Sequence, residues 1–315
     1  MPNVRRQSTL RLPATCGGIS LHGGRETRMA LHPAPVDTGI LLRRTDITDR
    51  DSIIAIRTES VTDVRNCTTV ANAAGVSVST VEHLLAAIAA TGIDNLLIDL
   101  DGPELPALDG SSEPFLKLIE HAGLERQAAP RRYLRVLEPV EVRDRNGGFA
   151  CIEPCDRLEL DVTIEFEDAA IGRQRVVIAP DVRAFRDRLA AARTFARKHE
   201  VAALQQAGLS MGGSLDNAIL VDGAEVLNPE GLRFEDEFVR HKALDLMGDL
   251  YLAGPVLGRV TAFKPGHGLN HDLLTALLAE RAAWRYDVLP GARALVGMMS
   301  ARQSRIGGER AALPA

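Results

Sequence analysis

Cysteines are few in this chain of 315 residues, and the features that mark secreted or membrane-spanning proteins are missing. The four cysteines, Cys16, Cys67, Cys151 and Cys155, are too few and too scattered for a disulfide framework in a chain of this length. No apolar run approaches the ~20 residues that a membrane-spanning helix needs. Residues 1–6 are polar and lack the hydrophobic segment of a signal peptide. We therefore expect a cytoplasmic protein with at most peripheral membrane contact.

An excess of positive charge is also lacking. The chain has 37 lysines and arginines against 42 aspartates and glutamates, a formal net charge of −5 at pH 7. Dedicated nucleic-acid-binding proteins carry a basic footprint that this balance does not provide. We expect no nucleic-acid partner, although a locally basic pocket is compatible with the overall charge.

The chain is long enough for two domains, at ~100–200 residues per domain. The segment 125–132 is polar, contains proline and has no hydrophobic period, which is typical of a domain boundary. We place the boundary near Gln127, between an amino-terminal α/β domain over 1–127 and a carboxy-terminal α/β domain over 128–302. A flexible tail is expected over 303–315.

Short apolar patterns and turn signals predict the secondary structure along both halves. The expected strands are 27–31, 39–43, 52–57, 95–100, 133–139, 149–153, 158–166 and 258–263, and the expected helices are 83–91, 114–121, 181–189, 234–252 and a helix after 270. The two halves echo each other, since His83 and His241 each lie on a helix that precedes a strand. A glycine-containing loop with a polar residue follows each strand, Asp109 in one half and His267 in the other. This echo favours two similar domains that meet at a shared site.

The strongest chemical signal lies in the helix expected over 234–252. At ~100° per residue, His241, Asp245 and Asp249 fall on one stripe, and the rest of the helix is apolar nearly all round. Such a helix is buried, and buried imidazoles and carboxylates need partners. His241 and Asp245 can present a nitrogen and an oxygen to one metal ion. The alternative is a hydrogen bond between them in a core without metal.

The pair Glu82-His83 opens the helix expected over 83–91. Ser79 and Glu82 form a capping-box pattern, in which the carboxylate closes back on the N-cap amide, and His83 alone reads as a core or surface residue. However, a glutamate directly before a histidine also matches a catalytic zinc site, which takes three nitrogen or oxygen ligands and leaves a fourth position for water. The adjacent carboxylate then serves as general base.

Two further segments are candidates for the same site. His267 stands between two glycines in a loop before the helix expected after Asn270, where Asp249 could orient it as a general acid. A solvated loop histidine is the alternative. The sequence Arg193-Thr-Phe195 and the glycine-rich stretch 209–215 could form an apolar wall beside a cationic rim, or a helix end followed by a loop.

Several motifs occur in an order that resembles a known family. They are Ser79-Thr-Val-Glu-His-Leu84, Gly92-Ile-Asp-Asn95, Asp109-Gly-Ser111, Ala192-Arg-Thr-Phe195, Gly212-Gly-Ser214, Asn228-Pro-Glu-Gly-Leu-Arg-Phe-Glu-Asp-Glu-Phe-Val-Arg-His-Lys242 and Gly266-His-Gly-Leu-Asn270. The chain resembles the UDP-3-O-acyl-N-acetylglucosamine deacetylases (LpxC), the zinc amidases of lipid A biosynthesis. The resemblance extends from about Thr9 to beyond Leu278.

The resemblance implies an α+β fold of two similar two-layer α/β domains, packed helix layer to helix layer as a β-α-α-β sandwich with small inserts. It implies one Zn²⁺ per chain, with His83, His241 and Asp245 as ligands. The first domain would supply Glu82 and His83, and the second would supply His241, Asp245 and His267.

Roles for other residues are implied in the same way. Glu82 would be the general base, and His267, paired with Asp249, would assist charge stabilisation and amine departure. Thr194 would help to hold the oxyanion. The implied substrate contacts are Lys242, Phe195, Gly212 and Ser214, with an acyl-chain passage built by the insert at about 193–222.

Two positions depart from the family pattern. Arg197 replaces an aromatic residue near the expected mouth of the passage, which puts the fit of the acyl chain in question. Glu153 stands where some relatives have a basic residue, which puts one diphosphate contact in question.

The function implied is zinc-dependent deacetylation of UDP-3-O-acyl-N-acetylglucosamine with release of acetate, the committed step of lipid A biosynthesis in the lipopolysaccharide of Gram-negative bacteria. The expected enzyme is a cytoplasmic monomer, and the resemblance leaves open whether the tail after Arg302 serves as a degradation signal. The alternatives are another zinc amidohydrolase acting on an acylated amino sugar or peptide, and a non-catalytic nucleotide-sugar or lipid-binding module.

Overall fold

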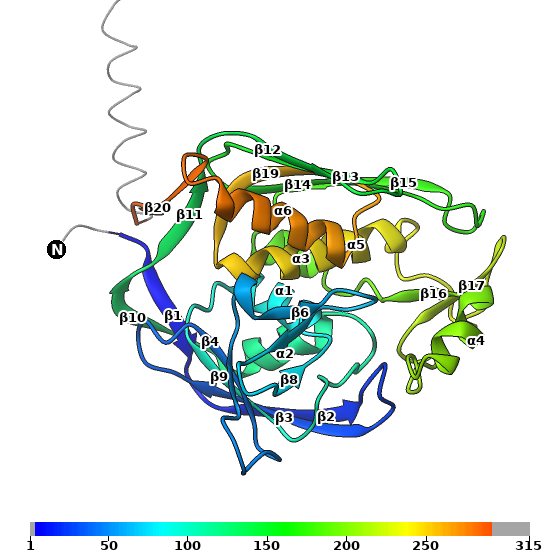
Figure 1. The fold of residues 1–315 in the computed structure, drawn as a ribbon, viewed down its shortest axis with the longest axis horizontal. Helices are drawn as coiled ribbons and strands as arrows, with labels where there is room; N and C mark the ends of the chain where they lie inside the picture. The colour runs from blue at the N-terminus through cyan, green and yellow to red at the C-terminus, as the bar shows by residue number, and fades with distance from the viewer. Residues whose placement is uncertain (1–3, 292–315) are drawn as a thin grey trace, which may run out of the picture.

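The computed structural model describes residues 4–291. Figure 1 shows four layers, in which two sheets lie outside and two groups of helices lie between them. This is the β-α-α-β order that the family resemblance implies. The tail expected over 303–315 lies outside the described residues, as do the last residues of the expected second domain.

The first half of the chain forms one outer sheet and the helices next to it. The sheet has the order β2-β3-β9-β4-β5. Its strands are β2 (Ala14–Ile19), β3 (Glu26–Pro33), β9 (Leu96–Leu100), β4 (Ile40–Arg44) and β5 (Ile53–Ala55). The helices are α1 (Glu82–Thr91) and α2 (Glu113–Ala122). The short helix η1 (Thr58–Ser60) and a small sheet of β6 (Val61–Asp63), β7 (Thr69–Ala71) and β8 (Ser77–Val78) connect β5 to α1.

The second half forms the other sheet and helix layer. The strands β12 (Val140–Arg143), β13 (Phe149–Glu153), β19 (Val256–Phe263), β11 (Arg132–Val136) and β20 (Trp284–Val288) lie in this order, and β14 (Leu158–Glu165) pairs with both β19 and β15 (Arg173–Ile178). The helices are α3 (Val182–Arg188), α5 (Glu237–Leu250), η2 (Tyr251–Ala253) and α6 (His267–Ala279). An insert carries β16 (Phe195–Arg197), α4 (Lys198–Gln206), β17 (Ile219–Asp222) and β18 (Glu225–Val226).

The predicted strands and helices are present, with most ends shifted by up to three residues. The segment 125–132, where the sequence places the domain boundary, is mostly extended and paired: β10 (Leu124–Pro130) pairs antiparallel with β1 (Arg6–Leu10), and β11 follows directly. The side chains of β10 are exposed or half-buried, so this strand is held by its backbone pairing and carries no apolar pattern. The insert is likewise not a plain loop, because β16 and β17 pair in parallel around α4.

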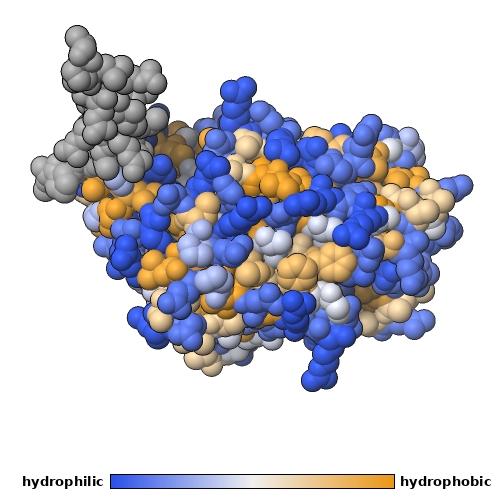
Figure 2. Space-filling view, turned by 90° about the horizontal axis from the view of Figure 1, so that it is seen from above, coloured by the Kyte–Doolittle hydropathy of each residue, from blue (hydrophilic) through white to orange (hydrophobic). Residues whose placement is uncertain are grey.

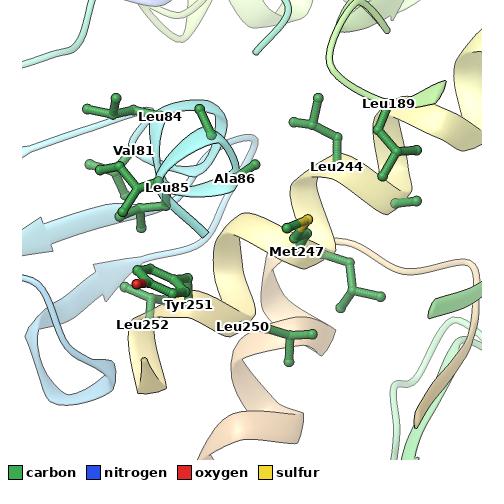
Figure 3. Close-up of a cluster of buried hydrophobic side chains, with 14 of the residues drawn as sticks. Val81, Leu84, Leu85, Ala86, Leu189, Leu244, Met247, Leu250, Tyr251 and Leu252 are labelled. Atoms are coloured by element: carbon green, nitrogen blue, oxygen red, sulfur yellow. The ribbon is translucent and has the colours of Figure 1, made fainter. Parts of the chain in front are cut away.

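The two helix layers meet where α1 packs against α5. Figure 3 shows α1, with Leu84, Leu85 and Ala86, beside α5 and η2, and places Leu85 next to Tyr251 of η2. Burying a leucine side chain is worth roughly 1.5–3 kcal/mol relative to leaving it exposed. As the sequence predicts, α1 ends at Gly92, whose φ of 77° suits glycine in a helix C-cap.

The outer surface of the second sheet has both hydrophobic and hydrophilic residues. Figure 2 looks onto the side of the second sheet, where hydrophobic residues gather in patches separated by hydrophilic ones. Several aromatic rings here are covered by cationic side chains, with Arg143 5.4 Å from the Phe149 ring centre and Lys264 5.1 Å from that of Phe263. Within residues 4–291, no helix is both long enough and apolar enough to cross a membrane.

Candidate metal centre

The predicted buried polar stripe of α5 faces the first residues of α1. His83, His241 and Asp245 each offer a ligand atom, and these atoms all lie within 4.8 Å of one another. The Oδ1 atom of Asp245 is 3.5 Å from Nε2 of His83 and 3.4 Å from Nε2 of His241. All three residues are buried. Among the residues that the structure describes, this is the one group of three or more such side chains close enough to hold a metal ion.

The side chains around these atoms fit a metal. The Nδ1–H of His241 donates to the Ala192 carbonyl at 3.0 Å, which leaves the Nε2 lone pair facing the cluster. Lys242 donates to Oδ2 of Asp245 at 2.6 Å, whereas Oδ1 is buried and has no hydrogen-bond partner. A buried carboxylate oxygen without a donor is costly unless a cation occupies the space before it. Two imidazoles and one carboxylate are also a common donor set for catalytic zinc.

The electrostatics favour ligating forms of two of these groups. Burial lowers the pKa of His241 to about 3, so its imidazole is neutral near pH 7. Burial alone would raise the pKa of Asp245, but His241 and Lys242 outweigh it and hold that pKa well below its usual range. Burial opposes a proton on His83, yet the Asp245 carboxylate, whose Oδ1 lies 3.5 Å from Nε2, raises the pKa of His83. A metal ion that binds Nε2 of His83 competes with a proton at this atom.

Glu82 points into the same site and is not a helix cap. The capping box expected from Ser79 and Glu82 is wrong, because α1 starts at Glu82 and its N-cap residue is Val81. The Glu82 carboxylate instead accepts a hydrogen bond from the backbone N–H of Thr68 at 3.1 Å. Burial raises the pKa of Glu82, partly opposed by His267 and His83. A carboxylate with a raised pKa beside a metal cluster can act as a general base.

His267 and Asp249 form a buried pair. His267 was expected in a loop before the helix, but it is the first residue of α6, which therefore begins before Asn270. Its Nδ1–H donates to Oδ2 of Asp249 at 2.8 Å, and its Nε2 lies 3.6 Å from Oε1 of Glu82. Burial would lower the pKa of His267, but Asp249 and Glu82 outweigh burial and raise it to about 9. The imidazole is therefore cationic near pH 7.

Two adjoining cavities lie beside the cluster. The larger, of about 560 Å³, is lined by Glu82, the three metal-ligand candidates, Lys242, His267, Thr194 and Phe195. A more apolar cavity of about 390 Å³ shares Thr194 and Phe195 and continues between α4 and residues 210–220. Ser214, a predicted substrate contact, lines this second cavity. Gly212 lines neither cavity, because its backbone packs on the loop after β2, where an added Cβ would lie 2.2 Å from the Ser20 carbonyl oxygen.

The two positions that depart from the family pattern, Arg197 and Glu153, lie in different places relative to the cavities. Arg197 lines the larger cavity but is paired with Asp168 and Glu200 and lies 5.7 Å from the centre of the Phe166 ring, so its charge is turned toward protein partners. Glu153 is exposed at the end of β13 and lines neither cavity.

Sequence reasoning missed several residues of this site. Thr68 bonds to Glu82 and to Asp249, and His22 lines both cavities. Thr68 has no local signal in the sequence, whereas His22 stands between two glycine pairs, Gly17-Gly18 and Gly23-Gly24. Asp109, which the internal echo paired with His267, accepts a hydrogen bond from Arg233 and lines neither cavity.

Comparison with known proteins assigns the chain to a family. Residues 7–279 match the family described as UDP-3-O-acyl N-acetylglycosamine deacetylase, LpxC. Three proteins named UDP-3-O-acyl-N-acetylglucosamine deacetylase are among its relatives. That of Phenylobacterium zucineum is 49% identical over 89% of this chain and 95% of its own length. Those of Shewanella frigidimarina and Idiomarina loihiensis are 42% and 43% identical, over 88% and 89% of this chain and 91% and 92% of their own lengths. The chain belongs to the LpxC family of deacetylases.

Proposed function

We propose that this chain is a zinc-dependent UDP-3-O-acyl-N-acetylglucosamine deacetylase of lipid A biosynthesis. The observation that carries the proposal is the convergence of His83, His241 and Asp245 with Glu82 on one wall of a cavity that adjoins an apolar cavity. An acylated sugar needs both spaces, one for the reacting acetamide and one for the acyl chain. Family membership and the names of the relatives support the same substrate.

In the proposed reaction, His83, His241 and Asp245 hold one zinc ion. The chemistry that a bound zinc supplies is polarisation of a carbonyl oxygen and a lowered pKa of water. Glu82 takes the proton of the attacking water, a role that suits a carboxylate whose pKa is raised by burial. The Thr68 N–H fixes one oxygen of this carboxylate and leaves the other toward His267.

Departure of the sugar amine needs a proton donor, and the negative charge that develops on the carbonyl oxygen needs a hydrogen-bond donor. His267, cationic and aimed at the site by Asp249, gives its Nε2 proton to the departing sugar amine. The Thr194 hydroxyl is proposed to hold the developing oxyanion. The Thr194 backbone is anchored on both sides, by its N–H to Gly110 and by its carbonyl to Ile219.

The remaining proposed contacts concern binding. Lys242 lines the larger cavity and offers positive charge to the substrate, while Phe195 and Ser214 border the apolar cavity proposed for the acyl chain. We also propose that the two halves divide into domains near Gln127, so that the substrate lies between them.

The test is acetate release from UDP-3-O-acyl-N-acetylglucosamine by zinc-loaded protein, for wild type and for Glu82→Gln. We expect wild-type turnover and a loss of about 10²–10⁴-fold in kcat for Glu82→Gln. The variant should still bind one zinc per chain by metal analysis, because Glu82 is not among the proposed ligands.

Glu113→Gln is the matched control, because Glu113 opens α2 as Glu82 opens α1 but lines neither cavity. Its activity should equal that of wild type. If folded, zinc-loaded wild type released no acetate, the proposed substrate would be wrong. Preference for an acylated amino sugar without the nucleotide would instead indicate a different zinc amidohydrolase.

A further inference from the structure

Thr68 lies behind the site and is bonded to both proposed proton-transfer groups. Its backbone N–H donates to Oε2 of Glu82 at 3.1 Å, and its hydroxyl donates to Oδ1 of Asp249 at 2.6 Å. Asp249 in turn accepts the Nδ1–H of His267, whose Nε2 is 3.6 Å from Glu82. Thr68, Glu82, His267 and Asp249 thus form a closed ring of contacts, in which Thr68 takes part with its backbone N–H and its hydroxyl.

We propose that Thr68 is a positioning residue that fixes the Glu82 carboxylate and the Asp249–His267 pair relative to each other. The proposal rests on the proposed function, since it assigns Thr68 to that reaction. Thr68 lines neither cavity, so it acts through its neighbours and not by touching substrate.

These hydrogen bonds are buried, so water cannot replace a donor that is lost. Thr68 is 1% exposed, and Glu82 and Asp249 are 2% and 1% exposed. Oδ2 of Asp249 is occupied by His267 and by the side-chain amide of Asn270, each at 2.8 Å, so the hydroxyl of Thr68 is the donor to Oδ1. Without that hydroxyl, a buried carboxylate oxygen loses its donor and Asp249 is held through Oδ2 alone.

The chain path adds a second reason. Thr68 and Glu82 belong to the first half of the chain, whereas Asp249 and His267 lie on α5 and α6 of the second. The Thr68 carbonyl also accepts the N–H of Val81, so the residue is tied to the start of α1 through its backbone. Its hydroxyl therefore connects the start of α1 to Asp249 in the last turn of α5.

Three substitutions separate the hydroxyl from the methyl group. Thr68→Val keeps the shape and the backbone N–H but removes the hydroxyl, Thr68→Ala removes hydroxyl and methyl, and Thr68→Ser keeps the hydroxyl. With zinc-loaded protein and UDP-3-O-acyl-N-acetylglucosamine, we expect kcat to fall about 10–100-fold in the valine and alanine variants, because loss of such supporting contacts has effects of this size. KM should change little, and Thr68→Ser should stay within a few-fold of wild type.

Thr58→Val is the matched control. Thr58 is also buried, but its hydroxyl has no hydrogen-bond partner among the described residues. Its kcat should equal that of wild type. A readout independent of turnover is the nitrogen-bound proton resonance of His267 Nδ1 in metal-free protein with labelled histidine. It should shift in Thr68→Val and remain in place in Thr68→Ser.

Each outcome decides the proposal. A kcat for Thr68→Val or Thr68→Ala equal to that of Thr58→Val would overturn it. An equal loss in Thr68→Ser and Thr68→Ala would assign the effect to packing of the methyl group and would also overturn it. The turnover of wild type tests the proposed function. The resonance shift of His267 tests the role of Thr68 independently, because it needs no substrate. If Thr68→Val does not fold, the comparison of alanine with serine gives the same decision.

Discussion

At the scale of single residues, three buried carboxylates share one site and have different partners. Glu82 has one backbone donor and a pKa raised by burial, which suits a base. The pKa of Asp245 is held low by His241 and Lys242, and one of its oxygens has no hydrogen-bond partner, which suits a ligand. Asp249 accepts hydrogen bonds from Thr68, His267 and Asn270, which suits an orienting group. Different surroundings give chemically identical carboxylates different pKa values, and this allows one site to perform acid and base chemistry at one pH.

The first prediction concerns the charge of His267. In metal-free protein its pKa of about 9 lies above the ordinary 6.5, because Asp249 and Glu82 outweigh burial. The protonated ring therefore adds to the free energy of unfolding below about pH 6.5, and this contribution is lost as the pH rises through about 9. In Asp249→Asn, burial should dominate and the pKa of His267 should fall by more than one unit. Titration of the ring carbon-bound protons by NMR measures this pKa.

Asp272→Asn serves as the control for that titration. Asp272 is an exposed carboxylate on the same helix, so its loss should move the pKa of His267 far less. An unchanged pKa in Asp249→Asn would mean that the hydrogen bond between Asp249 and His267 does not stabilise the cation.

At the scale of secondary structure, the contact between α1 and α5 carries the site. The two helices approach closely because Gly248 has no side chain, since an added Cβ would lie 2.1 Å from the Glu82 carbonyl oxygen. Gly248 is one turn beyond Asp245 on α5 and faces the first residue of α1. Helix packing at this glycine thus sets the distance between Glu82, His83 and the ligands on α5.

Gly248→Ala should therefore be destabilising even though alanine is the better helix former. Alanine gains about 0.5–1 kcal/mol over glycine inside a helix. Steric overlap in a well-packed core costs about 1–3 kcal/mol, and here the overlap is with rigid backbone. We expect the free energy of unfolding to fall by about 1–2 kcal/mol and zinc affinity to fall with it, measured by denaturant unfolding and metal titration. Gly18→Ala, whose added methyl would lie 3.4 Å from Leu108, should change neither. A variant as stable as wild type would show that the helices separate freely.

The sequence predicts these elements well wherever a pattern reports burial. The apolar run of α1 and the polar stripe of α5 are local periodic signals, and both helices are present. Glu82 was harder, because a capping box and an active-site base have the same local pattern, and the bond to Thr68 spans 14 residues. Gly248 and Thr68 act through contacts between the two halves, which no periodicity encodes. The strand β10 was missed because its pairing with β1 needs no apolar face.

At the scale of the whole molecule, the site exists because the two halves share one core. A single cluster of buried hydrophobic residues contains side chains of both sheets and of α1, α2, α5 and α6. The formal charge of −5 describes the chain as a whole, whereas the larger cavity has charges of both signs. Its cationic groups are Lys242, Lys264, Arg197 and His267, and its carboxylates are those of Glu82, Asp144, Glu200, Asp245 and Asp272.

Because the proposed ligands come from both halves, metal binding should stabilise the entire described fold. A ligand that binds only the native state at a free concentration 100 times its Kd adds about 2.7 kcal/mol to the free energy of unfolding. We expect zinc to give a shift of this size in wild type and almost none in His83→Ala, measured by denaturant unfolding at fixed free zinc. His121→Ala is the control, because His121 is exposed near the end of α2 and should leave the zinc effect intact. Full stabilisation of His83→Ala by zinc would place the metal elsewhere. Loss of the effect in His83→Ala alone would instead locate the metal where α1 meets α5, the contact through which the two halves depend on each other.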